Sequence, residues 1–240
     1  MTGVHTCALP IYIDYIKNDI TGDALAELSN RISTNHTFFF FFSGHFDFFT
    51  NTVLPDFKHR CATKISPRFR MWCAGCSFGD EPYSFAMSLM EFFGDAYDKW
   101  EIEMVATDIS LAALDCAKAG VYPEDRLKLV PPLWKQKYFT RLPDGSWQVD
   151  ECLRQQITFD RVNFINRCYP LTGSFHIISC RNVMIYFDQP TRDALIKKFY
   201  DYTAPGGYLF IGHSETLQRD NPYFEYVRPA IYRKASLSPT

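Results

Sequence analysis

The chain of 240 residues is 47% hydrophobic and 22% charged, and its formal net charge at pH 7 is −2. This length suffices for one sizeable core, or for one core with a small appendage. The near-neutral charge gives no general argument for binding nucleic acid or for insertion into a membrane, and no stretch approaches the about 18 apolar residues of a transmembrane helix. Eight cysteines without a secretory signal favour free thiols in a reducing cytoplasm.

The chain begins with two segments of different character. Met1–Pro10 show no periodicity, and we interpret them as a scar of cloning or gene assembly. Ile11–Ile32 carry apolar residues at helical spacing, with a break at Gly22. A helical segment is therefore expected before residue 33.

The most informative stretch is Arg70–Met87, RMWCAGCSFGDEPYSFAM. It begins within the short apolar run Phe69–Cys73, which is typical of a buried strand. Gly75 and Gly79 break this run, and apolar residues then recur at helical spacing, with Pro82 in the first helical turn, where its missing N–H would have no partner. Strand, glycine turn and helix together form the opening unit of a nucleotide-binding type of α/β fold.

The glycine turn limits what can bind there. Its spacing, Gly75-x-x-x-Gly79, matches neither the dinucleotide fingerprint nor the P-loop, and no lysine is at hand for a phosphate. Asp80 and Glu81 open the helix, and these acids would repel a phosphate placed at its positive end. A cationic cofactor with free hydroxyls and an amino group, such as S-adenosylmethionine (SAM), fits better.

The pair Cys73-x-x-Cys76 in the same turn has three interpretations. A zinc site would need a second pair, which the sequence lacks. A thioredoxin-like redox pair does sit at a strand-to-helix turn, but Ser77-Phe78-Gly79 separate this pair from the helix. We favour small residues that line a cofactor turn.

An acid ends the next predicted strand, Glu101–Thr107. A carboxylate at this place, Asp108, can accept two hydrogen bonds from ribose hydroxyls. It could instead cap the helix Leu111–Ala119, although Ser110 could also serve that role.

The rest of the chain alternates further strands with helices. A helix over Thr191–Tyr202 is expected to open at Asp188 and to stop at Pro205-Gly206-Gly207. One predicted strand, Phe175–Ser179, leads into Cys180-Arg181-Asn182 at the edge where ligands bind in open α/β sheets. The other expected strands are Tyr138–Arg141 and Trp147–Val149 as a hairpin, Ile157–Val162, Tyr208–Gly212, and the antiparallel pair Phe224–Val227 and Ala230–Arg233.

Several strings occur in the order that is typical of the CheR-type chemotaxis-receptor methyltransferases, and the sequence resembles that family from about Tyr12 to Arg233. The resemblance is carried by W-x-A-x-x-S-x-G-[DE]-E-P-Y-S in the central stretch and by Thr34–Thr37, Ala106–Ile109, Cys180–Asp188 and Gly212–Glu215.

The resemblance implies a fold, which is a Rossmann-like SAM-dependent methyltransferase sheet with helices on both faces and a small antiparallel β insert at about 135–158. Residues 1–32 would hold the scar and the remnant of an N-terminal helical domain, and residues 33–240 the methyltransferase domain. The activity implied is transfer of a methyl group from SAM to glutamate side chains of chemotaxis receptors, leaving S-adenosylhomocysteine. The alternative is a catalytically weak SAM-binding module for interaction or signalling.

The resemblance also implies roles for individual residues. Tyr186 is expected beside the transferred methyl, and no metal is implied. The partner would be the cytoplasmic domain of a methyl-accepting receptor. We expect the protein to be cytoplasmic and monomeric. The residues expected at the cofactor are Asn35, Thr37, Glu81, Asp108, Asn163, Phe164, Arg181 and Asn182. As alternatives, Asn163 could simply form a turn and Tyr186 could be a buried structural residue.

One position departs from the family pattern T-N-x-T-x-F-F-R. The place of the arginine is taken by Phe41, within a run of five phenylalanines. A phenyl ring offers none of the guanidinium's hydrogen bonds, so we expect weaker SAM binding and slower transfer than in a typical relative.

Overall fold

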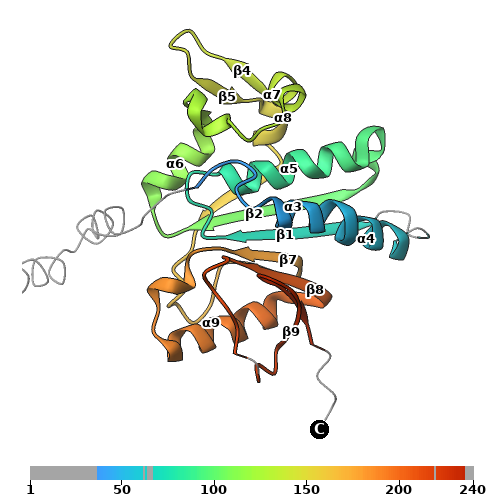
Figure 1. The fold of residues 1–240 in the computed structure, drawn as a ribbon, viewed down its shortest axis with the longest axis vertical. Helices are drawn as coiled ribbons and strands as arrows, with labels where there is room; N and C mark the ends of the chain where they lie inside the picture. Colours follow the sequence, from blue (N-terminus) through green and yellow to red (C-terminus); the bar gives the residue numbers. More distant parts are fainter. Residues whose placement is uncertain (1–36, 62, 64–66, 219, 236–240) are drawn as a thin grey trace, which may run out of the picture.

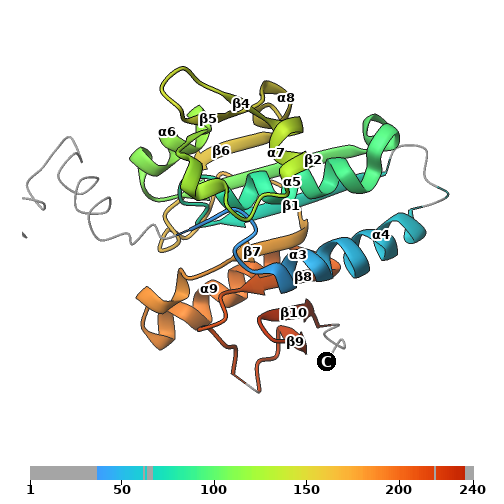
Figure 2. The same ribbon diagram turned by 45° about the horizontal axis from the view of Figure 1, so that its top comes forward.

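The computed structural model describes residues 37–61, 63, 67–218 and 220–235. The predicted helical segment before residue 33 lies outside these residues, and so does the predicted cofactor residue Asn35. Within them, seven strands form one sheet in the order β6-β2-β1-β7-β8-β10-β9 (Figures 1 and 2). Their bounds are β1 Arg68–Ala74, β2 Glu101–Asp108, β6 Ile157–Arg161, β7 Phe175–Cys180, β8 Thr203–Ile211, β9 Phe224–Arg228 and β10 Ile231–Lys234.

The sheet is parallel from β6 to β8, and β9 and β10 add an antiparallel pair at the end. The expected Rossmann-like sheet with a terminal antiparallel pair is therefore confirmed. The helices of the described chain are α3 Ser43–Phe48, a π-helical turn η1 Phe49–Val53, α4 Leu54–Arg60, α5 Asp80–Phe93, α6 Leu111–Ala119, α7 Pro132–Tyr138, α8 Glu151–Arg154 and α9 Gln189–Tyr202, with 3₁₀ turns η2 Gly94–Lys99, η3 Glu124–Leu127 and η4 Met184–Tyr186.

Alternate residues of β1 point to opposite faces of the sheet, and helices cover both faces. Phe69, Met71 and Cys73 pack in one hydrophobic cluster with side chains of α3, α4 and α5. Trp72 and Ala74 pack in a second cluster with side chains of α9. A strand that is buried on both faces explains why the sequence shows a continuous apolar run here rather than an alternating one.

Trp72 ties the ends of two central strands together. Its indole Nε1–H donates to Thr107 Oγ1 of β2 at 2.9 Å, and both residues are fully buried. The rings of Tyr169, Phe175 and Phe199 surround the indole at centroid distances of 5.4 to 5.8 Å. Because its N–H group has a hydrogen-bond partner, the large indole can lie in the core. The same hydrogen bond fixes β1 against β2 one residue before Asp108.

A second, three-stranded antiparallel sheet stands apart from the first, with β4 and β5 at the top of Figure 1. It contains the predicted hairpin, as β4 Phe139–Arg141 and β5 Trp147–Val149, and a further strand, β3 Val121–Tyr122. Tyr138 ends α7 instead of starting the hairpin.

The structure corrects one element boundary. The sequence placed the strand after α9 at Tyr208, beyond a Pro-Gly-Gly break. β8 in fact begins at Thr203, directly after α9, so Pro205 lies inside the strand. The pairing of β7 with β8 shifts register between Phe175 and Ile177, and such an irregularity accommodates a proline that cannot donate to the ladder.

Candidate active site

The site is formed where parallel strands end. β6, β2, β1 and β7 are neighbours in the parallel part of the sheet, so their carboxyl ends meet at one edge. Asp108 ends β2, Arg181 follows β7, and the glycine turn follows β1. Residues predicted from three separate stretches are therefore brought to the same edge, which is where open α/β sheets bind ligands.

The glycine turn is packed tightly against its neighbours. The N–H groups of Gly75 and Cys76 both donate to the carbonyl oxygen of Thr107, at 2.7 and 2.9 Å. Gly75 has φ +84°, and a Cβ added there would lie 2.4 Å from Cγ2 of Val183. Only glycine allows this backbone conformation together with this close approach, so the turn after β1 and the turn after β7 lie in contact.

Asp108 is almost fully buried, and its two oxygens are both engaged. Oδ2 accepts from the N–H of Ser77 at 2.8 Å, and Oδ1 accepts from the N–H of Ser110 at 2.9 Å. Ser110 itself caps α6, since its Oγ accepts from the N–H of Ala113, so the cap is Ser110 and not Asp108. Each Asp108 oxygen retains a lone pair for a further donor. Burial raises the pKa of this carboxyl, against the lowering effect of the backbone N–H groups.

Glu81 and Arg181 form an ion pair at the same edge. Oε2 of Glu81 lies 2.8 Å from Nη1 of Arg181, and the two side chains are only 11% and 6% exposed. The ring of Phe42 covers the guanidinium, with its centroid 4.4 Å from Cζ. Within the described part of the chain, Nε of Arg181 is buried and has no hydrogen-bond partner. A buried pair of this kind gains little net stability from its Coulomb attraction, which favours a role in binding.

Cys73 and Cys76 are both buried in the turn. Burial raises the pKa of both thiols well above the usual value, and nearby carboxylates add to the effect. Redox exchange requires a thiolate, so the redox interpretation of this pair is not favoured. In the described residues, no group of three or more His, Cys, Asp or Glu side chains could hold a metal ion.

The segment before α3 is held to α5 by an arginine that the sequence analysis missed. Arg126 makes two hydrogen bonds to Asp80, at 2.6 and 3.0 Å, and donates from Nη2 to the carbonyl oxygen of Thr37 at 2.9 Å. Asp80 is fully buried, and burial raises its pKa to about 6 in spite of this guanidinium. Thr37 thus reaches the start of α5 through its backbone.

Three of the four remaining predicted residues occupy turns. Oδ1 of Asn163 accepts from the N–H of Ile165 at 3.0 Å, which is the turn-forming alternative. Asn182 is exposed and has φ +58°. Tyr186 lies in η4 and is 53% exposed, so it is not a buried structural tyrosine.

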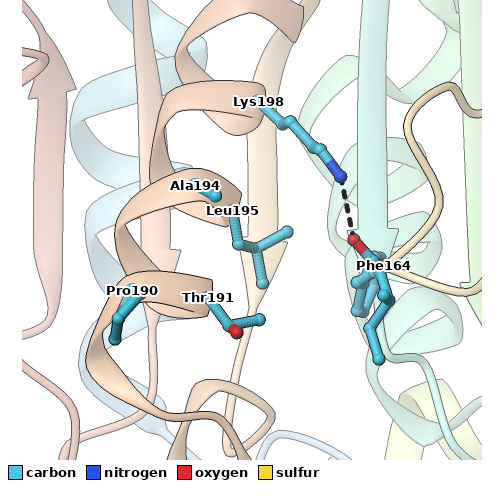
Figure 3. A pocket seen from close by; sticks show the side chains of 7 residues that line it. Phe164, Pro190, Thr191, Ala194, Leu195 and Lys198 are labelled. Atoms are coloured by element: carbon cyan, nitrogen blue, oxygen red, sulfur yellow. Dashed lines mark hydrogen bonds between the residues drawn. The ribbon is translucent and has the colours of Figure 1, made fainter.

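Phe164 lines a hollow of about 270 Å³ beside α9, shown in Figure 3. The carbonyl oxygen of Phe164 accepts from Nζ of Lys198 at 3.0 Å, and Leu195 and Thr191 form the opposite wall. The phenyl ring packs against Trp72 and Phe199. Its placement beyond β6 leaves it near the row of strand ends, on the α9 side of the sheet.

The donors and acceptors at this edge fit SAM. Asp108 has acceptor capacity left for hydroxyl groups, Glu81 can accept from an ammonium group, and the unpartnered Nε of Arg181 can donate to a carboxylate. These three functions match the ribose and amino-acid parts of SAM.

Comparison with known proteins decides the family. The family model described as "CheR methyltransferase, SAM binding domain" matches residues 35–232. The chain belongs to this family. A chemotaxis protein methyltransferase of Borreliella burgdorferi is 42% identical over 93% of this chain and 78% of that protein. Chemotaxis protein methyltransferase 2 of Vibrio cholerae is 33% identical over 94% of this chain and 76% of that protein.

A solved structure that matches the fold is more distant. PKMT2 from Rickettsia typhi in complex with AdoHcy aligns at a TM-score of 0.37 and 14% identity, over 60% of this chain and 20% of that one. This likeness is too weak to bear on function. Membership of the CheR family confirms the predictions of a SAM-dependent methyltransferase and of SAM as its cofactor. In the described residues, no helix has both the length and the apolar character needed to cross a membrane.

A second residue missed by the sequence analysis lies at the centre of this CheR domain. Glu215 belongs to the string Gly212–Glu215, which served only for the family resemblance. Its carboxylate accepts hydrogen bonds from the backbone N–H groups of Asn182, Val183, Met184 and Gly212. An acid four residues after the end of β8, in a string typical of the family, was the signal that could have drawn attention to it.

Proposed function

We propose that this chain transfers a methyl group from SAM to glutamate side chains in the cytoplasmic domain of a chemotaxis receptor, forming γ-glutamyl methyl esters. It would act in the cytoplasm as a monomer. The observation that carries the proposal is the buried Glu81–Arg181 ion pair at the strand-end edge of a CheR-family SAM-binding domain. The relatives named chemotaxis protein methyltransferase support the choice of receptor.

The proposed cofactor contacts follow from the chemistry of each group. Glu81 would accept from the ammonium group, Arg181 would donate to the carboxylate, and Asp108 would accept from the ribose hydroxyls. Asn163 and Phe164, beyond β6, are proposed at the adenine, with Asn35, Thr37 and Asn182 nearby.

When bound, SAM would supply a methyl group attached to its sulfonium. The substrate carboxylate oxygen would bond to the methyl carbon, and the electron pair of the broken carbon–sulfur bond would stay on sulfur. A glutamate side chain is already ionised at pH 7, so the chain needs no general base. Its residues must align the substrate carboxylate and keep water away from it. Tyr186, half exposed beyond the end of β7, is the residue proposed to act beside the methyl.

The test is methyl transfer from tritiated SAM to a purified receptor cytoplasmic domain. Radioactivity that alkali releases from the receptor as methanol identifies the ester. SAM affinity is measured in parallel by calorimetry. Transfer that is absent, or that appears only on groups stable to alkali, would refute the proposal.

A catalytically weak SAM-binding module is the second candidate, and Phe41 is the observation that favours it. This side chain stands where the family pattern has arginine and is 40% exposed. SAM binding without transfer to any receptor would favour this candidate over the enzyme.

A further inference from the structure

The Glu215 carboxylate fills all of its acceptor sites with backbone donors. Oε2 accepts from the N–H groups of Gly212 at 2.6 Å and Asn182 at 3.0 Å. Oε1 accepts from the N–H groups of Val183 at 3.0 Å and Met184 at 2.8 Å. A carboxylate has about four lone-pair sites. Glu215 therefore uses all of its acceptor capacity, on three N–H groups of the turn after β7 and on that of Gly212, which follows β8.

Three of these donors are consecutive and belong to the turn after β7. Asn182 has φ +58°, while Val183 has φ −113° and ψ −44°. Successive left-handed and right-handed residues turn their N–H groups toward one point and form a concave anion site. Here the anion comes from within the chain, 31 to 33 residues along the sequence.

This turn connects the two residues that matter most for the proposed chemistry. Arg181, which pairs with Glu81, directly precedes it, and Tyr186 ends the 3₁₀ turn that follows it. Val183 also lies against Gly75 of the cofactor turn. The position of the 182–184 backbone therefore sets the guanidinium, the tyrosine and one wall of the glycine turn together.

The space around Gly212 shows how closely the turn after β7 and the segment after β8 approach each other. A Cβ added there would lie 2.8 Å from Oδ1 of Asn182, 2.9 Å from its backbone nitrogen and 2.9 Å from Oε2 of Glu215. Any side chain at this position would have to push the carboxylate away from the turn. Gly212 and Glu215 thus act as one unit.

We propose that Glu215 is a positioning residue for methyl transfer, which acts through the 182–184 turn to hold Arg181 in the cofactor site and Tyr186 at the reacting methyl. This role rests on the proposed function and adds to it a residue that touches neither cofactor nor substrate. Charge-assisted hydrogen bonds are about twice as strong as neutral ones, so four of them on one carboxylate hold the turn in a single arrangement.

The test substitution is Glu215→Gln, which keeps the shape of the side chain. An amide offers one acceptor oxygen, and its NH₂ group would face two of the four N–H donors. The matched control is Glu103→Gln on β2, because Glu103 also accepts three short hydrogen bonds, from Arg68 and Arg70, at the opposite end of the strand from Asp108. The Glu103→Gln variant should lose a comparable amount of stability without changing the turn at residues 182–184.

The first measurement is amide hydrogen exchange in the cofactor-free protein. We expect the N–H groups of residues 182, 183, 184 and 212 to exchange at least tenfold faster in Glu215→Gln than in the wild type, and to be unchanged in Glu103→Gln. This result does not depend on activity. Unchanged exchange at these four amides would overturn the proposal.

The second measurement separates positioning from stability. In Glu215→Gln we expect SAM affinity to fall about tenfold and kcat on the receptor to fall tenfold or more, whereas Glu103→Gln keeps both at an equal melting temperature. In a Tyr186→Phe background the effect of Glu215→Gln on kcat should shrink severalfold, because residues that act as a unit are not additive. An equal effect in both backgrounds, or equal kcat in the two glutamine variants, would contradict the positioning role.

A second pair of variants guards against a folding defect in Glu215→Gln. Gly212→Ala should reproduce the faster exchange and the loss of kcat, while Gly44→Ala should not, since no atom lies within 4 Å of a Cβ added at Gly44. Failure of Gly212→Ala to change either quantity would oppose the proposal. If the wild type binds SAM but does not methylate a receptor, the proposed function fails, and exchange and SAM affinity still decide the role of Glu215 in holding the turn.

Discussion

Arg181 and Glu81 join the turn after β7 to the first turn of α5 through an ion pair of 2.8 Å. Two charges removed from water in this way need further partners to offset their desolvation, and the Nε of Arg181 has none within the described residues. A zwitterionic ligand offers each charge its complement. This geometry supports the proposal that the pair binds the amino-acid group of SAM.

The proposed ribose contact is tested by Asp108→Asn. The amide would place an NH₂ group against the N–H of Ser77 or Ser110 and would remove acceptor capacity from the ribose. We expect SAM affinity to fall by about tenfold or more, which corresponds to about 1.4 kcal/mol. Calorimetry with Asp160→Asn as control, an exposed acid on the next strand, provides the measurement. Unchanged affinity would remove Asp108 from the site.

Tyr186 is tested by removing only its hydroxyl. If it acts at the transfer step, Tyr186→Phe should lower kcat by about ten- to a hundredfold and leave SAM affinity near the wild-type value. Tyr226→Phe, an exposed tyrosine on β9, is the matched control. A parallel loss of SAM affinity and kcat in Tyr186→Phe would indicate a binding role instead.

How far local sequence predicts this site differs from residue to residue. The strand over Phe69–Cys73, the glycine turn and α5 follow from apolar spacing and proline placement, which are local signals, and the structure has them as β1 and α5. Asp108, Arg181 and Tyr186 were found because they follow predicted strands or lie in strings of the family. The topology of a parallel sheet then places the first two at one edge.

The partners of other residues could not be found in this way, because they depend on contacts between distant segments. Arg126 and Asp80 are 46 residues apart, and Glu215 lies 33 residues from Asn182. No periodicity marks such pairs. The predicted start of β8 was wrong for a related reason. The sequence placed a break at Pro205-Gly206-Gly207 after the helix, whereas Thr203 already pairs with Phe175 of β7.

Asp80 predicts a pH dependence of stability. Burial raises its pKa from 3.8 to about 6, so the folded state binds this proton more tightly than the unfolded chain does. The contribution of Asp80 to the free energy of unfolding is then full below about pH 4 and is lost as pH rises through 6. A pKa difference of about two pH units corresponds to about 3 kcal/mol.

The measurement is urea unfolding of the wild type and of Asp80→Asn between pH 4 and pH 7. Relative to the variant, which cannot titrate at this position, the wild type should lose stability as pH rises across this range. A wild type that instead gained stability relative to Asp80→Asn would show that the attraction of Arg126 outweighs the cost of burying the carboxylate.

The ring of Phe42 lies between Phe41 and Arg181 of the proposed cofactor site. The centroid of the Phe41 ring is 4.7 Å from that of Phe42, and the Phe42 ring in turn lies 4.4 Å from Cζ of Arg181. The family pattern places arginine at the position of Phe41, and a guanidinium offers five donors in a fixed fork. A carboxylate that is left without such a partner costs about 1–3 kcal/mol, which is about one to two powers of ten in affinity or rate.

We therefore expect Phe41→Arg to raise both SAM affinity and turnover on the receptor by about ten- to a hundredfold. The substitution also breaks the run of five phenylalanines and should improve solubility, so Phe41→Gln serves as the control. Glutamine gives a similar gain in polarity without the charge or the fork. Calorimetry and the tritium assay on the wild type and the two variants separate the effects. If arginine improves activity no more than glutamine does, the gain comes from solubility, and Arg181 already supplies the cation that the cofactor carboxylate needs.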